Sequence, residues 1–239
     1  MEKESKTSYL ILGVFIFLGL STLGYLLGKS AIEFKQLDRS VTVKGLSERE
    51  QSADIVIWPI QFTEAGNDLE GLYGTIEKST AKIQAFLEKN GINPGEVTFA
   101  SPSITDKSAQ QYGTSPKAEF RYTAIQTVTV YSENIDAVRA VKGKLSELGK
   151  QGIVFSVVDY QAQTEYIFTR LNEIKPEMIE EATRKAREVA EKFALDSKSR
   201  LGKIKTASQG QFSISDRDKN NPHIKKIRVV STVEYYLSD

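Results

Sequence analysis

An uncharged run near the N-terminus constrains this chain of 239 residues more than any other feature. No residue between Thr7 and Gly28 is charged, and Tyr9 to Leu27 is mainly Leu, Ile, Val, Phe and Gly. About 18 or more such residues suffice for a helix to cross a hydrocarbon core of about 30 Å. No second run of this length follows. We therefore expect a short cytoplasmic N-terminus (1–8), one membrane span that contacts the lipid bilayer (9–28), a linker (29–38) and a soluble body.

A cleaved signal peptide is the alternative interpretation of this run. Its apolar region usually has about 7–15 residues and ends at a small-x-small cleavage site. The run here is longer, and the nearest such site, Gly28-Lys29-Ser30, carries a lysine inside the motif. Both observations favour an uncleaved anchor.

Charge alone leaves the orientation of the span open. Basic residues flank both of its ends: Lys3 and Lys6 on one side, and Lys29, Lys35, Arg39 and Lys44 on the other. A plain positive-inside count would leave the body in the cytoplasm. The rule weakens for long domains, however, because these translocate largely regardless of charge.

Composition limits what the body can bind. The chain has 32 basic and 31 acidic side chains, hence a formal net charge of +1, and it lacks the basic blocks typical of nucleic-acid binding. We expect no nucleic-acid partner. With no cysteine in the sequence, disulfides, thiolate catalysis, iron–sulfur clusters and zinc sites with sulfur ligands are excluded. We expect no metal and no other cofactor.

The first part of the body predicts a β-α-β-β-α-β order, the ferredoxin-like plan of two helices on one face of an antiparallel sheet. The expected strands are 53–64, a strand from 97 to about 101, 120–131 and 153–162, and the expected helices are 69–87 and 135–148. Asp68 is the expected N-cap of the first helix, and Asn90-Gly91 is its expected stop. In the strand 120–131 we expect Tyr122, Ala124, Gln126, Val128 and Val130 on one face. Trp58 fits a core position or an interface anchor.

Further elements are expected on both sides of this core. A strand over Val41–Lys44 should join the strand 53–64 through a hairpin at Ser47–Ser52. A third helix should begin close to Pro176, with one apolar side that includes Met178, Ile179, Ala182, Ala186, Val189, Ala190 and Phe193. Two strands, 202–214 and 225–237, should close the chain around a polar loop.

Three groups of segments, in this order, point to a known family. They are Arg39–Gly45 with Ala53–Ile57; Tyr122–Val130; and Ala182–Ala190 leading through Leu201–Ile204 to Val229–Tyr235. They resemble the SIMPL-domain family of bacterial envelope proteins. The resemblance implies a mixed α+β domain over 39–239, located in the periplasm behind an export signal or inner-membrane anchor, with a tendency to self-associate. It implies loose links to envelope integrity and oxidative stress, and it transfers no catalytic residue.

Few residues carry catalytic chemistry. His223 is the only histidine and lies beside Asn221 and Pro222, so we interpret it as a solvated loop residue. Ser79 and Lys82 match the Ser-x-x-Lys pattern of penicillin-recognising enzymes, but they lie in mid-helix without the Ser-Asp-Asn or Lys-Thr-Gly partners. Carboxylates are frequent, as at Glu48, Glu50, Asp54, Glu64 and Asp68, and solvated surface is their default role. Phosphate-binding glycine loops are absent from the sequence.

Small residues in the apolar run offer one candidate contact. Ser21, Gly24 and Gly28 stand at i, i+3 and i+7, so they share a helix face and include a Gly-x-x-x-Gly step. Such a face lets two membrane helices approach closely. Glycine is also common in membrane helices, so an incidental occurrence stays open.

We expect a non-enzymatic structural or binding module in a homo-oligomer. The alternative is an envelope hydrolase with an unrecognised Ser/Lys or carboxylate site. An adaptor that binds another envelope protein through an exposed strand edge is a third option.

Overall fold

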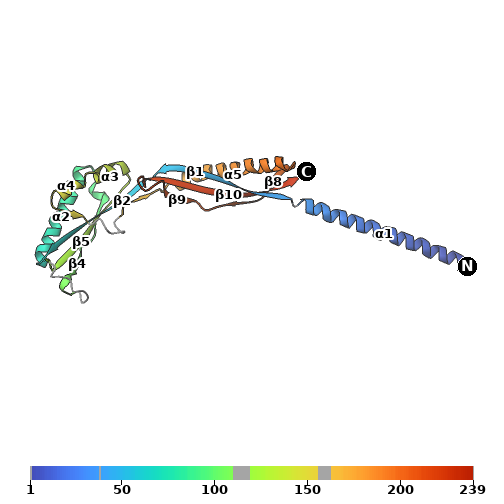
Figure 1. Cartoon of the computed structure of the whole chain (residues 1–239), viewed down its shortest axis with the longest axis horizontal. Coiled ribbons are helices and arrows are strands. Elements are labelled where there is room, and N and C mark those ends of the chain that lie inside the picture. Colours follow the sequence, from blue (N-terminus) through green and yellow to red (C-terminus); the bar gives the residue numbers. More distant parts are fainter. Residues whose placement is uncertain (1, 38, 110–118, 156–162, 239) are drawn as a thin grey trace. The chain divides into compact units, whose positions relative to one another are not determined.

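A computed structural model of the chain describes residues 2–37, 39–109, 119–155 and 163–238. The chain divides into two compact units. Unit 1 comprises Met1–Glu48, Lys175–Ser213 and Arg228–Asp239, and unit 2 comprises Arg49–Ile174 and Ile214–Ile227. Figure 1 shows the helices and strands with the labels used below.

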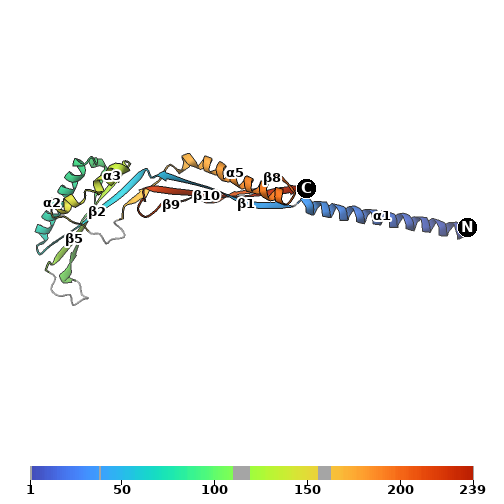
Figure 2. The same ribbon diagram turned by 45° about the horizontal axis from the view of Figure 1, so that its top comes forward.

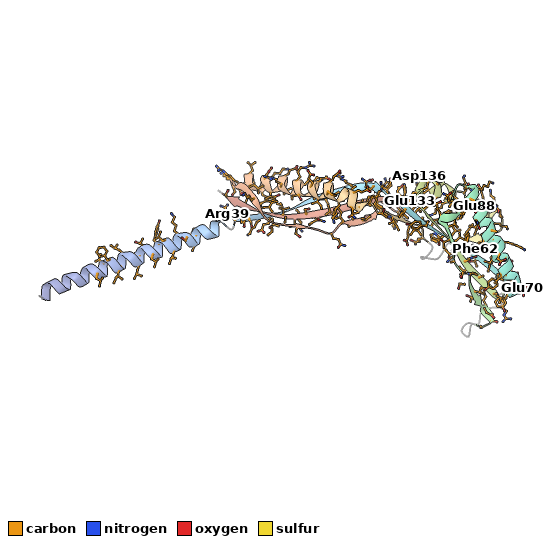
Figure 3. All side chains as sticks on the ribbon, turned by 180° about the vertical axis from the view of Figure 1, so that it is seen from behind. Arg39, Phe62, Glu70, Glu88, Glu133 and Asp136 are labelled. Atoms are coloured by element: carbon orange, nitrogen blue, oxygen red, sulfur yellow. The ribbon has the colours of Figure 1, made fainter. Side chains whose placement is uncertain are left out.

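The N-terminal segment is one helix, α1 (Glu2–Leu37). Its stretch Leu12–Ile32 is long and apolar enough to cross a membrane, and none of that stretch is buried. The described side chains of α1 project outward without protein neighbours (Figure 3). The helix continues to Leu37, so most of the expected linker, 29–38, is helical.

Unit 2 contains a six-stranded sheet that follows the expected ferredoxin-like plan. Its strands are β2 (Ile55–Gly66), β3 (Val97–Phe99), β4 (Ser103–Asp106), β5 (Tyr122–Ser132), β6 (Val154–Phe155) and β7 (Glu165–Ile167). The order is β3-β5-β2-β6, with β4 also on β5 and β7 also on β2. All of these pairs are antiparallel. The long central strands β2 and β5 are thus flanked by two short strands on each side.

Three helices cover one face of this sheet and form the core of unit 2. They are α2 (Leu69–Lys89), α3 (Ile135–Lys142) and α4 (Ser146–Gly149), and they lie on the same side of β2 and β5 in both views (Figure 1, Figure 2). Every second residue of β2 from Val56 to Phe62 is buried against them, Trp58 included. Trp58 is therefore a core residue.

The strand β5 confirms the predicted alternation of faces. Ala124, Gln126, Val128 and Val130 are buried, whereas Ile125 and Tyr131 on the other face are exposed. The predicted limits of α2 are also confirmed. Asp68 caps its start by accepting a hydrogen bond from the Gly71 amide at 2.7 Å. Gly91 follows its end with a φ of 89°, a conformation that glycine adopts without steric cost.

Unit 1 is built around a second sheet. Its strands are β1 (Ser40–Ser52), β8 (Arg200–Gln209), β9 (Ser213–Asp216) and β10 (Ile224–Ser238), in the order β1-β10-β8, with β9 also on β10. The end of β1, most of β9 and the start of β10 fall within the bounds of unit 2. The helix α5 (Leu171–Asp196) runs along these strands in both views (Figure 1, Figure 2). Its buried row consists of Met178 and four alanines spaced four residues apart, Ala182 to Ala194.

The close fit of α5 on β1 depends on one glycine. A Cβ atom at Gly45 would lie 1.8 Å from the Ala182 carbonyl oxygen and 2.5 Å from the Ala186 amide nitrogen. Glycine inside a strand often marks such an approach of another backbone. Ser47, two residues further along the same face, donates a hydrogen bond to Glu181 at 2.8 Å. Alanine on the helix and glycine on the strand together let the two backbones pack closely.

The predicted hairpin at Ser47–Ser52 is wrong. β1 continues through these residues and pairs with β10, whereas β2 pairs with β5. The segment Ser47–Ser52 contains no Gly, Pro, Asn or Asp to form a tight turn. The strand is interrupted instead at Ala53 and Asp54, between the end of β1 and the start of β2. There the Asp54 carboxylate accepts hydrogen bonds from the Thr169 amide and hydroxyl, each at 3.0 Å.

The third helix also departs from expectation. α5 begins at Leu171, so Pro176 lies inside it, and Val189 and Phe193 are exposed. A step of four residues advances about 400° around a helix, so a row spaced by four drifts about 40° per step. The alanine row therefore winds around α5 and leaves Val189 and Phe193 on a flank.

Three further boundaries differ. The expected helix over 135–148 is split at Gly143 into α3 and α4. The strand expected over 153–162 is seen as β6, and residues 156–162 lie outside the described residues. The strand expected over 202–214 is divided into β8 and β9. β4 and β7 are short strands that were not predicted, because three or four alternating residues give a weak periodic signal.

Candidate functional site

The small-residue face of α1 is the candidate site that the sequence singled out. On the helix, Ser21, Gly24 and Gly28 lie within about 60° of one another around the axis. No atom of the protein lies within 4 Å of a Cβ built at Gly24 or Gly28. The neighbouring Thr22 hydroxyl donates to the Leu18 carbonyl at 2.8 Å, so it is satisfied within the helix. The face is open, and contact with a second helix stays a prediction.

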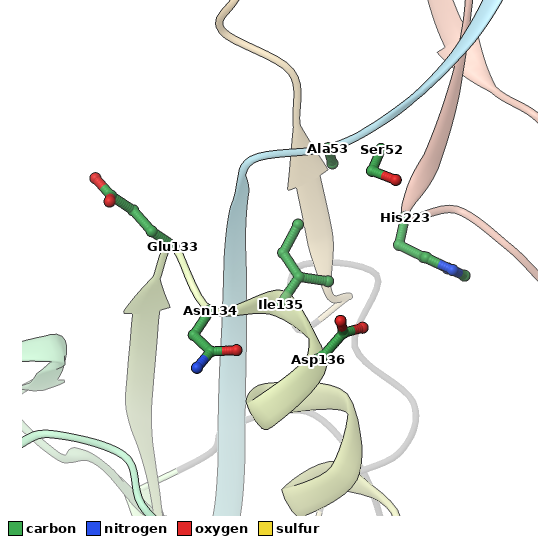
Figure 4. Close-up of a pocket in the computed structure, with 7 residues that line it drawn as sticks. All are labelled: Ser52, Ala53, Glu133, Asn134, Ile135, Asp136 and His223. Carbon is green, nitrogen blue, oxygen red and sulfur yellow. The ribbon is translucent and has the colours of Figure 1, made fainter.

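A pocket in unit 2 gathers polar side chains that are distant in the sequence. Its volume is about 450 Å³, and it is lined by Ser52, Ala53, Glu133, Asn134, Ile135, Asp136 and His223 (Figure 4). The end of β1, the start of α3 and the residue before β10 supply these side chains. Spacing in the sequence gave no signal for this pocket, because the fold alone brings its three segments together.

The pocket residues are held by local contacts. The Asn134 side chain caps α3 by accepting a hydrogen bond from the Ala137 amide at 3.1 Å. The Ala53 amide donates to the His223 carbonyl at 2.8 Å. The His223 ring lies edge-on to Tyr166, with centroids 6.0 Å apart. His223 is therefore half-buried and packed, where the sequence predicted a solvated loop residue.

Burial is the main reason that the pKa of His223 is lowered. Arg139 and Arg217 lower it further, whereas Asp136 and Asp218 act in the opposite direction. The imidazole is therefore neutral at pH 7, since its ordinary pKa is already about 6.5. A neutral imidazole can accept or donate a hydrogen bond to a ligand.

The pocket does not assemble a catalytic triad. Ser52 and Asp136 are exposed, and no hydrogen bond joins His223 to a hydroxyl or carboxylate of the described lining residues. Asp136 rises from α3 toward the His223 segment, whereas Glu133 points away (Figure 4). Asp136 forms an ion pair with Arg139 at 3.7 Å. The arrangement offers shallow, polar binding contacts instead of a nucleophile activated by a base.

Ser79 and Lys82 have separate structural partners. The buried Ser79 hydroxyl donates to the Glu64 carboxylate at 2.6 Å. The Lys82 ammonium donates to the Gln151 carbonyl at 3.1 Å. A serine nucleophile of this type needs its lysine as a base and an open path for the substrate. Ser79 instead links α2 to β2.

The carboxylates that the sequence drew attention to also have structural contacts. Asp68 caps α2, Glu64 accepts from Ser79, and Glu50 lies 3.7 Å from Arg217. Burial would raise the pKa of Asp54, but hydrogen bonds from Thr169 and Arg170 outweigh it and keep that pKa low. In the described part of the chain, no group of three or more His, Asp or Glu residues could hold a metal ion.

Comparison with known proteins gives one match. Residues 41–233 match the family model SIMPL, described as a protein of unknown function (DUF541). No curated protein matches the chain. The match covers both sheets and the helices of the body, and most of the segments that suggested the resemblance lie inside it. The chain therefore belongs to the SIMPL family.

Proposed function

We propose that this protein is a single-pass bacterial inner-membrane protein with its body in the periplasm. The body acts as a non-enzymatic structural or binding module and assembles as a homo-oligomer. The resemblance to the SIMPL family loosely connects such a role with envelope integrity and oxidative-stress tolerance. In this role the body can also bind a second partner, another envelope protein.

The observation that carries the proposal is the uncovered apolar helix in front of the SIMPL body. None of Leu12–Ile32 is buried in the protein, so its leucine, isoleucine and phenylalanine side chains lack a protein core. Burial of each such side chain is worth about 1.5–3 kcal/mol. A lipid bilayer supplies that burial for a helix of this length.

The absence of an assembled catalytic group supports a non-enzymatic role. His223 is without a paired hydroxyl or carboxylate among the described pocket residues, and Ser79 is buried against Glu64. A serine-reactive phosphonate probe tests this. Labelling of Ser79 that disappears in Ser79→Ala would contradict the proposal and favour the hydrolase alternative.

Alkaline phosphatase fused after Asp239 tests the location of the body. The enzyme is active only after export, because its disulfides need an oxidising compartment. We expect the alkaline phosphatase fusion to be active. A second fusion at the same position, with a reporter that works only in the cytoplasm, should be inactive. The reverse result would place the body in the cytoplasm.

Light scattering tests assembly of the body. A chain shortened to begin at Ala31 should have a mass above that of one protomer at tens of micromolar protein. A strictly monomeric mass would refute assembly through the body. It would leave the Ser21, Gly24 and Gly28 face as the remaining contact within the span.

A further inference from the structure

One face of the six-stranded sheet in unit 2 is not covered by the helices of that unit. The helices pack on the face that contains the even-numbered β2 residues Val56 to Phe62. The odd-numbered residues of β2 therefore point to the opposite side, since successive strand residues alternate. The odd-numbered residues of β5 share that side, because Ile57 is paired with Tyr131 and Thr63 with Ile125. We call this surface the open face.

The open face gathers exposed apolar side chains from three strands. Tyr131 and Ile125 on β5 are 50% and 39% exposed, Val154 on β6 is 64% exposed, and Ile167 on β7 is 36% exposed. Their register forms two pairs on this face. Val154 lies beside Thr63, which pairs with Ile125, and Ile167 lies beside Ile55, close to the pair of Ile57 and Tyr131. Single exposed apolar residues are normal on a surface, but a group on one face marks an interaction site.

The open face is also nearly free of charge. Every second β2 residue from Ile55 to Thr63, and every second β5 residue from Thr123 to Tyr131, is uncharged. Among the flanking strands, β7 adds one charged residue on this side, Glu165, which pairs with Ile57. Charged residues make up 26% of the chain, so about two or three charges would be expected among ten such surface positions. A solvated sheet face normally carries charges that prevent association, and their absence fits a face that is covered in use.

The size of the open face fits a protein interface. β2 and β5 are paired from Val56 with Ser132 to Gly66 with Tyr122, which at about 3.4 Å per residue is a length of about 35 Å. Four strand positions about 4.8 Å apart give a width of about 19 Å. The product, about 670 Å², is close to the roughly 800 Å² that each partner buries in a standard interface.

We propose that the open face is the surface through which two copies of this chain pack, sheet against sheet. The proposal rests on the homo-oligomer proposed above and names its contact surface. A second copy fits because the two central strands of the face, β2 and β5, offer no charge there for a charged partner to complement. In an isologous contact the uncharged centres of two such faces can meet without like-charge repulsion, while Glu165 lies toward the edge, on the short strand β7. Threonine, isoleucine and valine side chains suit the packing of two sheets at about 10 Å.

Cross-linking of the full chain in its membrane tests the proposal. The chain has no cysteine, so one introduced cysteine is a unique site. Thr127→Cys lies mid-way along the open face, and Thr75→Cys is the matched control on the exposed side of α2. With a short bis-maleimide we expect a dimer band from Thr127→Cys and none from Thr75→Cys. Each variant is first labelled with a single maleimide to show that its thiol reacts.

A charge substitution then tests the contact itself. Thr129→Lys, added to Thr127→Cys, should abolish the dimer band, and Thr75→Lys should leave it unchanged. Co-expression of the Thr129→Lys and Thr129→Glu forms should restore the band. Thermal unfolding of each variant shows that the fold is kept.

The results separate this proposal from the homo-oligomer itself. If the unmodified full chain has an oligomeric mass but Thr127→Cys gives no cross-link, the open face is not the contact surface, and the proposal of a homo-oligomer is unaffected. A monomeric mass with no cross-link refutes both. A cross-linked band that contains another protein, or a dimer band that survives Thr129→Lys, also overturns the pairing of two copies.

Discussion

Gly45 is the residue at which the fold tolerates a side chain least. In Gly45→Ala the new methyl group would overlap the Ala182 carbonyl, so α5 would have to move away from β1. Overpacking of this kind costs about 1–3 kcal/mol, and more where the obstacle is backbone. We expect the free energy of unfolding to fall by at least that amount in urea denaturation followed by circular dichroism.

Gly74 provides the matched control for that substitution. It lies in α2, and no atom is within 4 Å of its built Cβ. Gly74→Ala should therefore raise the free energy of unfolding by about 0.5–1 kcal/mol, the usual gain of alanine over glycine in a helix. Equal stabilities for Gly45→Ala and the unmodified protein would show that α5 does not pack closely on β1.

His223 predicts a pH dependence of stability. Its pKa is lowered in the folded protein, chiefly by burial, so the unfolded chain takes up a proton first as the pH falls below about 6.5. The free energy of unfolding should therefore decrease as the pH falls from the pKa of His223 in the unfolded chain to its lower pKa in the folded protein. The variant His223→Gln should lose less of its free energy of unfolding over the same pH range. Urea midpoints at pH 7.5 and pH 5 measure the difference. The idea is wrong if both proteins lose the same stability.

At the scale of elements, strong periodic signals predicted the structure well. α2 has apolar residues at helical spacing, a capping aspartate and a terminal glycine, and β5 alternates over its whole length. The path of β1 could not be predicted, because local residues do not specify whether β2 or β10 is the partner. The split of the helix at Gly143 was missed for a similar reason: periodicity continues across the turn.

The cap of α2 can be tested directly. Asp68→Ala removes the acceptor of the Gly71 amide and should lower the free energy of unfolding by about 1 kcal/mol. Asp68→Asn keeps a side-chain oxygen at the cap and should lose much less. Trp58 is the only tryptophan and lies in the core beneath this helix, so its fluorescence reports the transition. Similar losses in both variants would mean that the negative charge, and not the cap, is what matters.

At the scale of the whole molecule, the span offers a test of helix association. Gly24→Ile adds a branched side chain where the protein itself has free space, so it should not disturb the folded protomer. If α1 associates through this face, the larger side chain should weaken the association, which energy transfer between labelled copies in vesicles can measure. Gly19→Ile, on a different side of the helix, should have little effect. Equal energy transfer in both variants would remove Ser21, Gly24 and Gly28 from the contact.

The three candidate surfaces, the face on α1, the pocket at His223 and the open face, differ in how far the sequence could predict them. The face on α1 follows from spacing alone, because a helix has a fixed period. The pocket at His223 and the open face depend on tertiary structure. The alternation of β5 predicts that Ile125 and Thr127 share the side opposite Ala124 and Val128. Val154 and Ile167 lie on that side only through the register of β6 and β7.

The position of β10 sets the order in which the chain can fold while it leaves the ribosome. β10 lies between β1 and β8, yet it follows both of them in the chain. The six-stranded sheet has all its strands once Ile167 has emerged, whereas β1 and β8 have no partner between them until the final residues appear. Until then, both strands have unpaired backbone groups along the sides that β10 will occupy. The sheet of unit 1 can therefore close only after the sheet of unit 2 has all of its strands.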